Sequence, residues 1–123
     1  MLSEEEMTLI ADAAKGWGKK HGAFGQANSS FAEEGAAAWD ELVALGFAGA
    51  LISEPYGGSE IGLRATGRIM AEMGRSLATS PFLSTAILAA DLITRCGSSA
   101  QRQFWLPSLV EGSRFAVGVG SGT

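Results

Sequence analysis

The chain has 123 residues, of which 46% are hydrophobic and 18% charged, and its formal net charge is −4. Such a composition is typical of one globular domain, and an intrinsically disordered chain is not expected. The sequence has no basic cluster and no run of about 18 apolar residues, so nucleic-acid binding and membrane insertion are not expected. Residues 1–6 lack the basic start of a signal peptide, and Cys96 is the single cysteine, which together favour a cytoplasmic location.

The first predicted helix begins at Ser3, which is placed to form a capping box with Glu6. Its buried face is predicted from apolar residues at helical spacing: Met7, Ile10, Ala14 and Trp17. Gly16 or Gly18 is expected to end the helix. The acidic residues 4–6 favour the positive end of the helix dipole, so we interpret them as a solvated first turn rather than as a metal or acid–base site.

Residues 19–30 have no apolar periodicity and are rich in Gly, Asn and Ser, which predicts a loop. His21, the only histidine, lies here beside two lysines, and no Cys, His or Asp stands at ligand spacing from it. We therefore expect His21 to be solvated rather than catalytic or metal-binding.

A second helix is predicted over residues 31–45, where apolar residues again recur at helical spacing. Trp39, Leu42 and Val43 are expected to face inward. Gly46 follows the last turn and is expected to close the helix, because glycine readily takes the left-handed conformation of a helix end.

The next stretch predicts an irregular connection. Residues 47–52 are expected to form a short extended piece or an irregular buried link, and residues 53–59 are rich in turn-forming types. The Gly-Gly pair at 57–58 is not followed by the Lys-Ser or Lys-Thr of a phosphate-binding loop. We interpret the pair as a sharp corner.

Two apolar helices are predicted at the centre of the chain, over residues 61–77 and 82–96, joined by a corner at 78–81. Pro81 suits the first turn of the second helix, where a missing N–H costs nothing. Their buried faces are predicted from Ile69, Met70, Met73 and Leu77 in the first helix, and from Phe82, Leu83, Ala86, Ile87, Ala90 and Ile93 in the second. We expect the two helices to pack against each other.

The last predicted helix begins with a second capping box, formed by Ser98 and Gln101. Phe104, Trp105 and Leu106 are expected to face inward. Pro107 is expected to break this helix or to begin a new turn, which carries Leu109 and Val110 and ends at Gly112. Cys96, just before this helix, lies at a helix C-terminus where the dipole disfavours a thiolate, so we expect it to be inert.

Residues 114–119 alternate as a strand does, and glycines follow at 118, 120 and 122. A single strand is not stable by itself, and no helix follows the glycines to complete a dinucleotide fingerprint. We therefore predict an all-α fold, an orthogonal or up–down bundle of about five to six helices, with the first strand of a missing β domain at its C-terminus. The predicted helical domain spans residues 1–113, and residues 114–123 are the start of that β domain or a tail.

Five segments, in order, resemble the N-terminal helical domain of the acyl-CoA dehydrogenases. They are W-D-E-L-V-A-L-G-F-A-G-A at 39–50, S-E-P-Y-G-G at 53–58, E-M-G-R-S-L at 72–77, P-F-L-S-T at 81–85 and G-S-S-A-Q-R-Q-F-W-L-P-S-L-V-E-G at 97–112. The resemblance implies an FAD-dependent enzyme that removes hydrogens from the α and β carbons of an acyl-CoA thioester and passes a hydride to FAD. It also implies that the catalytic glutamate and most of the flavin site lie in a β middle domain and a C-terminal helical bundle. No catalytic, cofactor or metal residue is therefore expected in this chain, and FAD is not expected to bind it alone.

By the same resemblance, the helix beginning near Phe82 and the corner before it form a wall of the acyl-chain pocket. The candidate wall residues are Pro81, Phe82, Thr85, Leu88 and Ala89. Phe82 is the largest of them and is a candidate to restrict the acyl chain length. For each of the five taken singly, a plain core residue of a helix pair is the favoured interpretation.

Three classes of function stay open at this level. The chain is part of a flavoenzyme, a non-catalytic subunit or interaction module of this fold, or part of a related flavin-dependent oxidase or monooxygenase. Its expected partners are the middle and C-terminal domains or a partner subunit, acyl-CoA in the complete protein, and further copies in a homo-oligomer. An apolar face that those domains normally cover is expected to cause association in solution.

Overall fold

A computed structural model describes residues 2–22 and 31–121, and within these residues the fold is all-α, as predicted, with no strand. Helices α1 and α2 come first, followed by two short 3-10 helices, and then α3, the π-helix η3, α4 and α5. Their bounds are Glu4–His21 (α1), Phe31–Ala44 (α2), Phe47–Gly49 (η1), Glu54–Tyr56 (η2), Gly62–Ser76 (α3), Leu83–Ala89 (η3), Ala90–Cys96 (α4) and Ser99–Val110 (α5). No helix of the described residues is long and apolar enough to cross a membrane.

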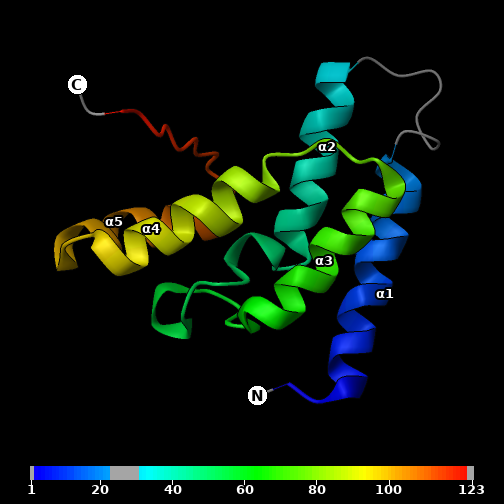
Figure 1. Ribbon diagram of the computed structural model, residues 1–123, viewed down its shortest axis with the longest axis horizontal. Helices are drawn as coiled ribbons and strands as arrows, with labels where there is room; N and C mark the ends of the chain where they lie inside the picture. Colours follow the sequence, from blue (N-terminus) through cyan, green and yellow to red (C-terminus); the bar gives the residue numbers. More distant parts are fainter. Residues whose placement is uncertain (1, 23–30, 122–123) are drawn as a thin grey trace.

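The helices form two groups (Figure 1). Helices α1, α2 and α3 lie beside one another, whereas α4 and α5 run together away from that group and across its direction. The buried side chains form two clusters, the larger mainly in the first group and the smaller mainly in the second. We call the first group the three-helix region, and we call η3, α4 and α5 with residues 113–121 the arm.

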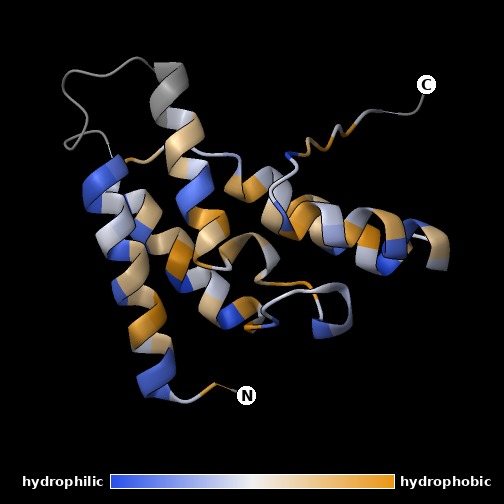
Figure 2. Cartoon of the chain, turned by 180° about the vertical axis from the view of Figure 1, so that it is seen from behind, coloured by the Kyte–Doolittle hydropathy of each residue, from blue (hydrophilic) through white to orange (hydrophobic). Residues whose placement is uncertain are grey.

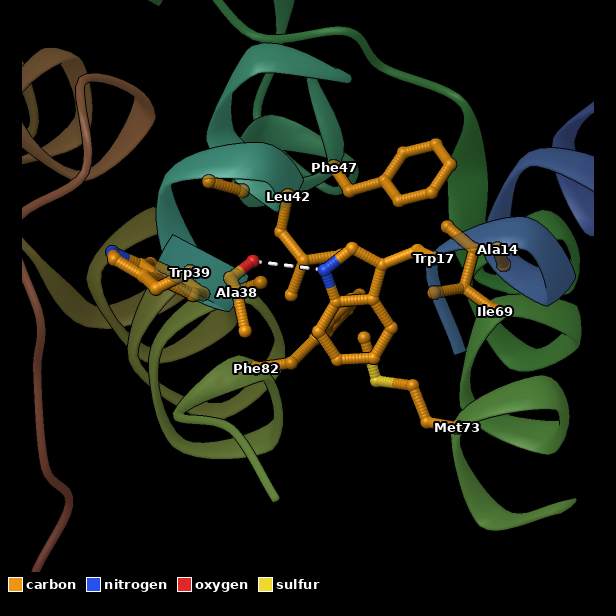
Figure 3. Close-up of a cluster of buried hydrophobic side chains, with 11 residues drawn as sticks. Ala14, Trp17, Ala38, Trp39, Leu42, Phe47, Ile69, Met73 and Phe82 are labelled. Carbon is orange, nitrogen blue, oxygen red and sulfur yellow. Dashed lines mark hydrogen bonds between the residues drawn. The ribbon is translucent and has the colours of Figure 1, made fainter. Parts of the chain in front are cut away.

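The core of the three-helix region is built around Trp17 (Figure 3). Its indole N–H donates a hydrogen bond of 2.8 Å to the carbonyl oxygen of Ala38 on α2, which satisfies the one polar atom that the ring buries. The same cluster of buried side chains also contains Ala14, Ala38, Trp39, Leu42, Phe47, Ala48, Ile69, Met73, Phe82 and Ala86. The helical spacing of Trp39 and Leu42 therefore predicted their burial correctly, while Val43 is only partly buried.

Helix α3 packs mainly along α1, not against the helix that follows it. The backbones approach closely near Gly18, where a Cβ would lie 2.7 Å from the Ser76 Oγ. At the other end, Arg64 and Arg68 of α3 both bind the Glu4 carboxylate, with N–O distances of 2.9 and 3.0 Å. The predicted packing of residues 61–77 on 82–96 is observed only in part: Met73 and Phe82 share the core, but α3 lies along α1. Periodicity identifies an apolar face but not its main partner.

Helix α1 also runs past both glycines that were expected to end it and stops at His21. Residues 19–21 are thus helical rather than part of a loop, and residues 23–30 of that predicted loop lie outside the described part.

His21 is not solvated, since only 8% of it is exposed. Its ring lies 5.5 Å from that of Trp17, and its Nε2 lies 2.9 Å from the Glu41 carboxylate on α2. His21 is therefore buried beside α2, although the polar residues next to it in the sequence suggested that it would be exposed.

The connection from α2 to α3 is compact and helical rather than extended. Residues 47–49 form a buried 3-10 helix, and the corner predicted at 53–59 is present. Gly57 has a φ of +89°, and a Cβ at Gly58 would lie 1.9 Å from the Ile52 carbonyl oxygen. The glycine pair thus serves backbone geometry, as the sequence predicted.

The arm has a smaller core, formed by Ile52, Ala89, Ala90, Leu106 and Leu109. Figure 2 shows hydrophobic residues along these helices, where they extend from the rest of the molecule. Phe104 and Trp105, which were expected to face inward, are 67% and 42% exposed. Pro107 does not break α5 but lies inside it, near its end, where only one helical hydrogen bond is lost.

The segment after α5 has neither helix nor strand over residues 113–121. The strand predicted at 114–119 is therefore not observed, and the described residues hold no second strand with which it could pair. Instead, Phe115 packs against the arm core, and its backbone forms hydrogen bonds with the side chain of Thr85 in η3.

Candidate functional site: an apolar groove beside helix α4

Two adjoining hollows border α4, with volumes of about 520 and 430 Å³. They share Leu92, Cys96 and Val117 in their walls, so we describe them together as the α4 groove. The first is further lined by Ala89, Ile93, Gly97, Gln101, Trp105, Phe115, Ala116 and Gly118. The second is further lined by Leu51, Leu63, Ile87, Leu88, Asp91 and Arg95.

One wall of the groove comes from a single helical face. Leu88, Leu92 and Cys96 are spaced by four along η3 and α4, which places them on the same side of the helix. The two leucines are 46% and 49% exposed, a large apolar surface to leave in contact with water. This face is directed away from the arm core, which α4 reaches through Ala90.

The opposite wall of the larger hollow comes from α5 and the segment that follows it. Trp105 packs edge-on against Phe115, with ring centroids 5.5 Å apart. Residues 116–118 continue from Phe115 along the same hollow. Part of this wall therefore has no secondary structure and depends on side-chain contacts for its position.

Charge is confined to a pair of side chains in the smaller hollow. Arg95 Nε lies 2.8 Å from Asp91 Oδ1, and this hydrogen bond raises the pKa of the Arg95 guanidinium. Most of the remaining lining is apolar or backbone. In the described residues, no group of three or more His, Cys, Asp or Glu side chains is arranged to hold a metal ion. The arrangement suits a hydrocarbon chain more than a phosphate or a metal.

The structure places the five predicted wall residues in different surroundings. Leu88 lines the smaller hollow and Ala89 the larger one. Thr85 is fully buried and directs its hydroxyl toward the Phe115 backbone. Phe82 belongs to the core of the three-helix region and borders a separate hollow of about 390 Å³ with Met73 and Leu83, while Pro81 is partly buried at the corner.

Sequence reasoning missed Leu92, Cys96 and Val117, which the two hollows share. The four-residue spacing from Leu88 to Leu92 and Cys96 was a usable pattern, because it marks a second apolar stripe beside the buried one. No comparable pattern points to Val117, since its place beside α4 depends on a contact across 30 residues.

Comparisons with known proteins agree on one family. The family model for the acyl-CoA dehydrogenase N-terminal domain matches residues 4–113. The acyl-CoA dehydrogenase FadE27 of Mycobacterium tuberculosis is 32% identical over 76 residues, which cover 62% of this chain and 20% of that protein. A solved structure of a variant of the Tcur3481–Tcur3483 steroid ACAD matches 90% of this chain and 31% of its own, with a TM-score of 0.77 and 31% identity. The chain thus spans less than a third of either relative.

Proposed function

The chain belongs to the acyl-CoA dehydrogenase family, matching its N-terminal domain, and from this membership we propose that it is the N-terminal domain of an FAD-dependent acyl-CoA dehydrogenase. The complete protein would remove hydrogens from the α and β carbons of an acyl-CoA thioester. Residues 1–113 would form the helical domain, and residues 114–123 would lead into the next one. The complete enzyme would be cytoplasmic and a homo-oligomer.

The α4 groove supports a role in holding the acyl chain. Its main wall presents Leu88 and Leu92 to solvent, and the adjoining hollows extend along α4. An acyl chain that covered these side chains would remove apolar surface from water, which favours binding by roughly 25 cal/mol per Å². Of the five proposed wall residues, Leu88 and Ala89 have the most direct support, because they line the groove themselves.

The lining of the α4 groove does not favour FAD. A flavin dinucleotide needs donors for its pyrophosphate, whereas the groove presents mainly apolar side chains, and Arg95 is already paired with Asp91. We therefore assign FAD and the catalytic glutamate to other domains of the complete protein. This chain would contribute the pocket wall and inter-domain contacts, and it would be inactive alone.

The first test is an absorbance titration of this chain with FAD, with and without an acyl-CoA. Absence of flavin binding and of bleaching is expected. Tight flavin binding that acyl-CoA bleaches would contradict the proposal, because a complete site would then exist within 123 residues.

The second test uses the complete flavoprotein with Leu92→Phe, which narrows the groove. The catalytic efficiency kcat/KM is expected to fall for long or polycyclic acyl-CoA thioesters and to change little for short ones. Polycyclic substrates are included because the solved relative is a steroid ACAD. Leu9→Phe is the matched control, since Leu9 is an exposed leucine on α1, away from the groove. An unchanged substrate profile for Leu92→Phe would show that the groove is not part of the acyl pocket.

Phe82→Ala is less informative about chain length than Leu92→Phe. Phe82 packs beside Trp17 and Met73 in the core (Figure 3), so its truncation costs about 3–5 kcal/mol of stability. A change in substrate preference would then need the stability of the variant to be measured alongside it. An unchanged preference would still remove Phe82 from the pocket.

A further inference from the structure

Thr85 makes a hydrogen-bond pair that sets it apart from other threonines of the fold. Its Oγ1 accepts from the Phe115 backbone N–H at 2.9 Å and donates to the Phe115 carbonyl oxygen at 3.2 Å. The side chain is fully buried. A single hydroxyl thus satisfies both backbone groups of one residue, as a neighbouring strand would otherwise do.

Threonines elsewhere in the helices use their hydroxyls locally. Thr66 donates to the Gly62 carbonyl and Thr94 to the Ala90 carbonyl, each four residues back in the same helix at 2.7 Å. This local bond is the usual one for a helical threonine. Thr85 instead lies in the π-helix η3 and bonds a residue 30 positions later. The hydroxyl of Thr85 is therefore used for a long-range contact.

That contact holds the part of the groove wall that has no secondary structure. Phe115 is bonded by Thr85 on its backbone, and its ring packs edge-on against Trp105. Residues 116–118 follow directly and line the larger hollow, and Val117 lines both. Without the Thr85 bonds, the side chains of Phe115 and Val117 still pack against the arm core, but no backbone group of Phe115 is held by Thr85.

We propose that Thr85 is a positioning residue whose hydroxyl holds residues 115–118 in place as the second wall of the α4 groove. The attachment itself stands on the hydrogen bonds and is independent of any ligand. Its consequence for acyl-CoA rests on the function proposed above. Thr85 is buried and does not line the groove, so it acts through Phe115 and Val117 rather than as a wall residue itself.

The attachment is tested in this chain with Thr85→Val, which keeps the shape of the side chain and removes the hydroxyl. Hydrogen exchange of the Phe115 amide is expected to become about five- to tenfold faster, the change that corresponds to losing one ordinary hydrogen bond. Thr85→Ser keeps the hydroxyl and is expected to restore slow exchange. Thr66→Val is the matched control, because Thr66 is equally buried but bonds only its own helix.

Tryptophan fluorescence gives a second measurement of the same attachment. Trp105 is 42% exposed, whereas Trp17 and Trp39 are buried, so iodide quenches mainly Trp105. Release of the Phe115 ring is expected to increase that quenching in Thr85→Val and not in Thr85→Ser or Thr66→Val. Unchanged Phe115 exchange and unchanged quenching in a folded Thr85→Val protein would overturn the proposal.

The consequence for substrate is tested in the complete flavoprotein by flavin bleaching with a long acyl-CoA. Thr85→Val is expected to raise KM several-fold with a smaller change in kcat, and Thr85→Ser is expected to restore KM. If the unaltered protein is not bleached by any acyl-CoA, the proposed function fails, while the exchange result still decides the attachment. If it is bleached and Thr85→Val leaves KM unchanged, the positioning role is overturned.

Discussion

The three-helix region and the arm differ in how completely they bury their tryptophans. In the three-helix region Trp17 and Trp39 are buried, and each indole N–H has a carbonyl partner, at 2.8 Å on Ala38 and 2.7 Å on Gly112. In the arm, Trp105 and Phe104 remain exposed although they pack edge-on against each other. The larger core, to which Ala86 of η3 also contributes, thus encloses its tryptophans, while the arm leaves two aromatic side chains exposed. The larger buried core therefore lies among α1–α3, and the groove proposed to hold the acyl chain lies beside α4.

The largest effect is expected for Trp17→Ala in the three-helix region. The substitution removes the central ring of the larger core and its hydrogen bond to Ala38, at a cost of about 3–5 kcal/mol. That is a large part of the 5–15 kcal/mol typical of a whole domain. Denaturant unfolding followed by circular dichroism measures the loss. Leu9→Ala, at an exposed position of the same helix, is the control and is expected to change stability by less than about 0.5 kcal/mol.

Leu106→Ala is expected to have the next largest effect, and a more local one. Leu106 is fully buried in the small arm core, and the loss is about 2–3 kcal/mol because fewer neighbours enclose the cavity. Amide exchange is expected to accelerate in α4 and α5 and to stay slow in α1 and α3. Equal acceleration in all four helices would mean that the two regions unfold as one unit and do not differ in local stability.

The two capping boxes provide a matched pair across the regions. Ser3 accepts a bond from the Glu6 amide and Ser98 from the Gln101 amide, both at 3.1 Å. Replacing either serine by alanine is expected to cost about 1 kcal/mol. Thermal unfolding is combined with amide hydrogen exchange measured in each region. Ser98→Ala is expected to destabilise the arm alone, and Ser3→Ala the three-helix region alone. If either substitution destabilised the other region, or both regions equally, the division into a three-helix region and an arm would be contradicted.

The smallest expected effect is the pH dependence contributed by Glu41. Hydrogen bonds from Lys20, and secondarily from His21, lower the pKa of this carboxyl below 4.5 in the folded chain. The ionised form is therefore favoured by folding, so the stabilisation is present above pH 4.5 and is lost as pH falls through the folded pKa. The effect is small because the side chain is partly exposed. Urea unfolding at a series of pH values is expected to show a weaker acid dependence for Glu41→Gln than for the unaltered chain, and equal dependence would exclude this contribution.

Local features of the fold were predictable from the sequence because their interactions join residues close in the chain. The two capping boxes, the left-handed Gly46 after α2 and the glycine corner at 57–58 are all present as predicted. Each depends on hydrogen bonds or backbone angles within a few residues. The resemblance of five short segments to one family likewise needed no long-range information, and the family match agrees with it.

Only the tertiary structure determined which apolar faces pack against one another. Residues of α3 and of the helix after it show equally good periodicity, yet α3 packs on α1, and Phe104 and Trp105 stay outside although their pattern suggested burial. His21 is buried by contact with α2, and the expected strand is replaced by an attachment to Thr85. The physical reason is that the hydrophobic effect has no preferred direction. An apolar pattern in the sequence indicates that a side chain will be buried, but only the packing of the helices determines which element buries it.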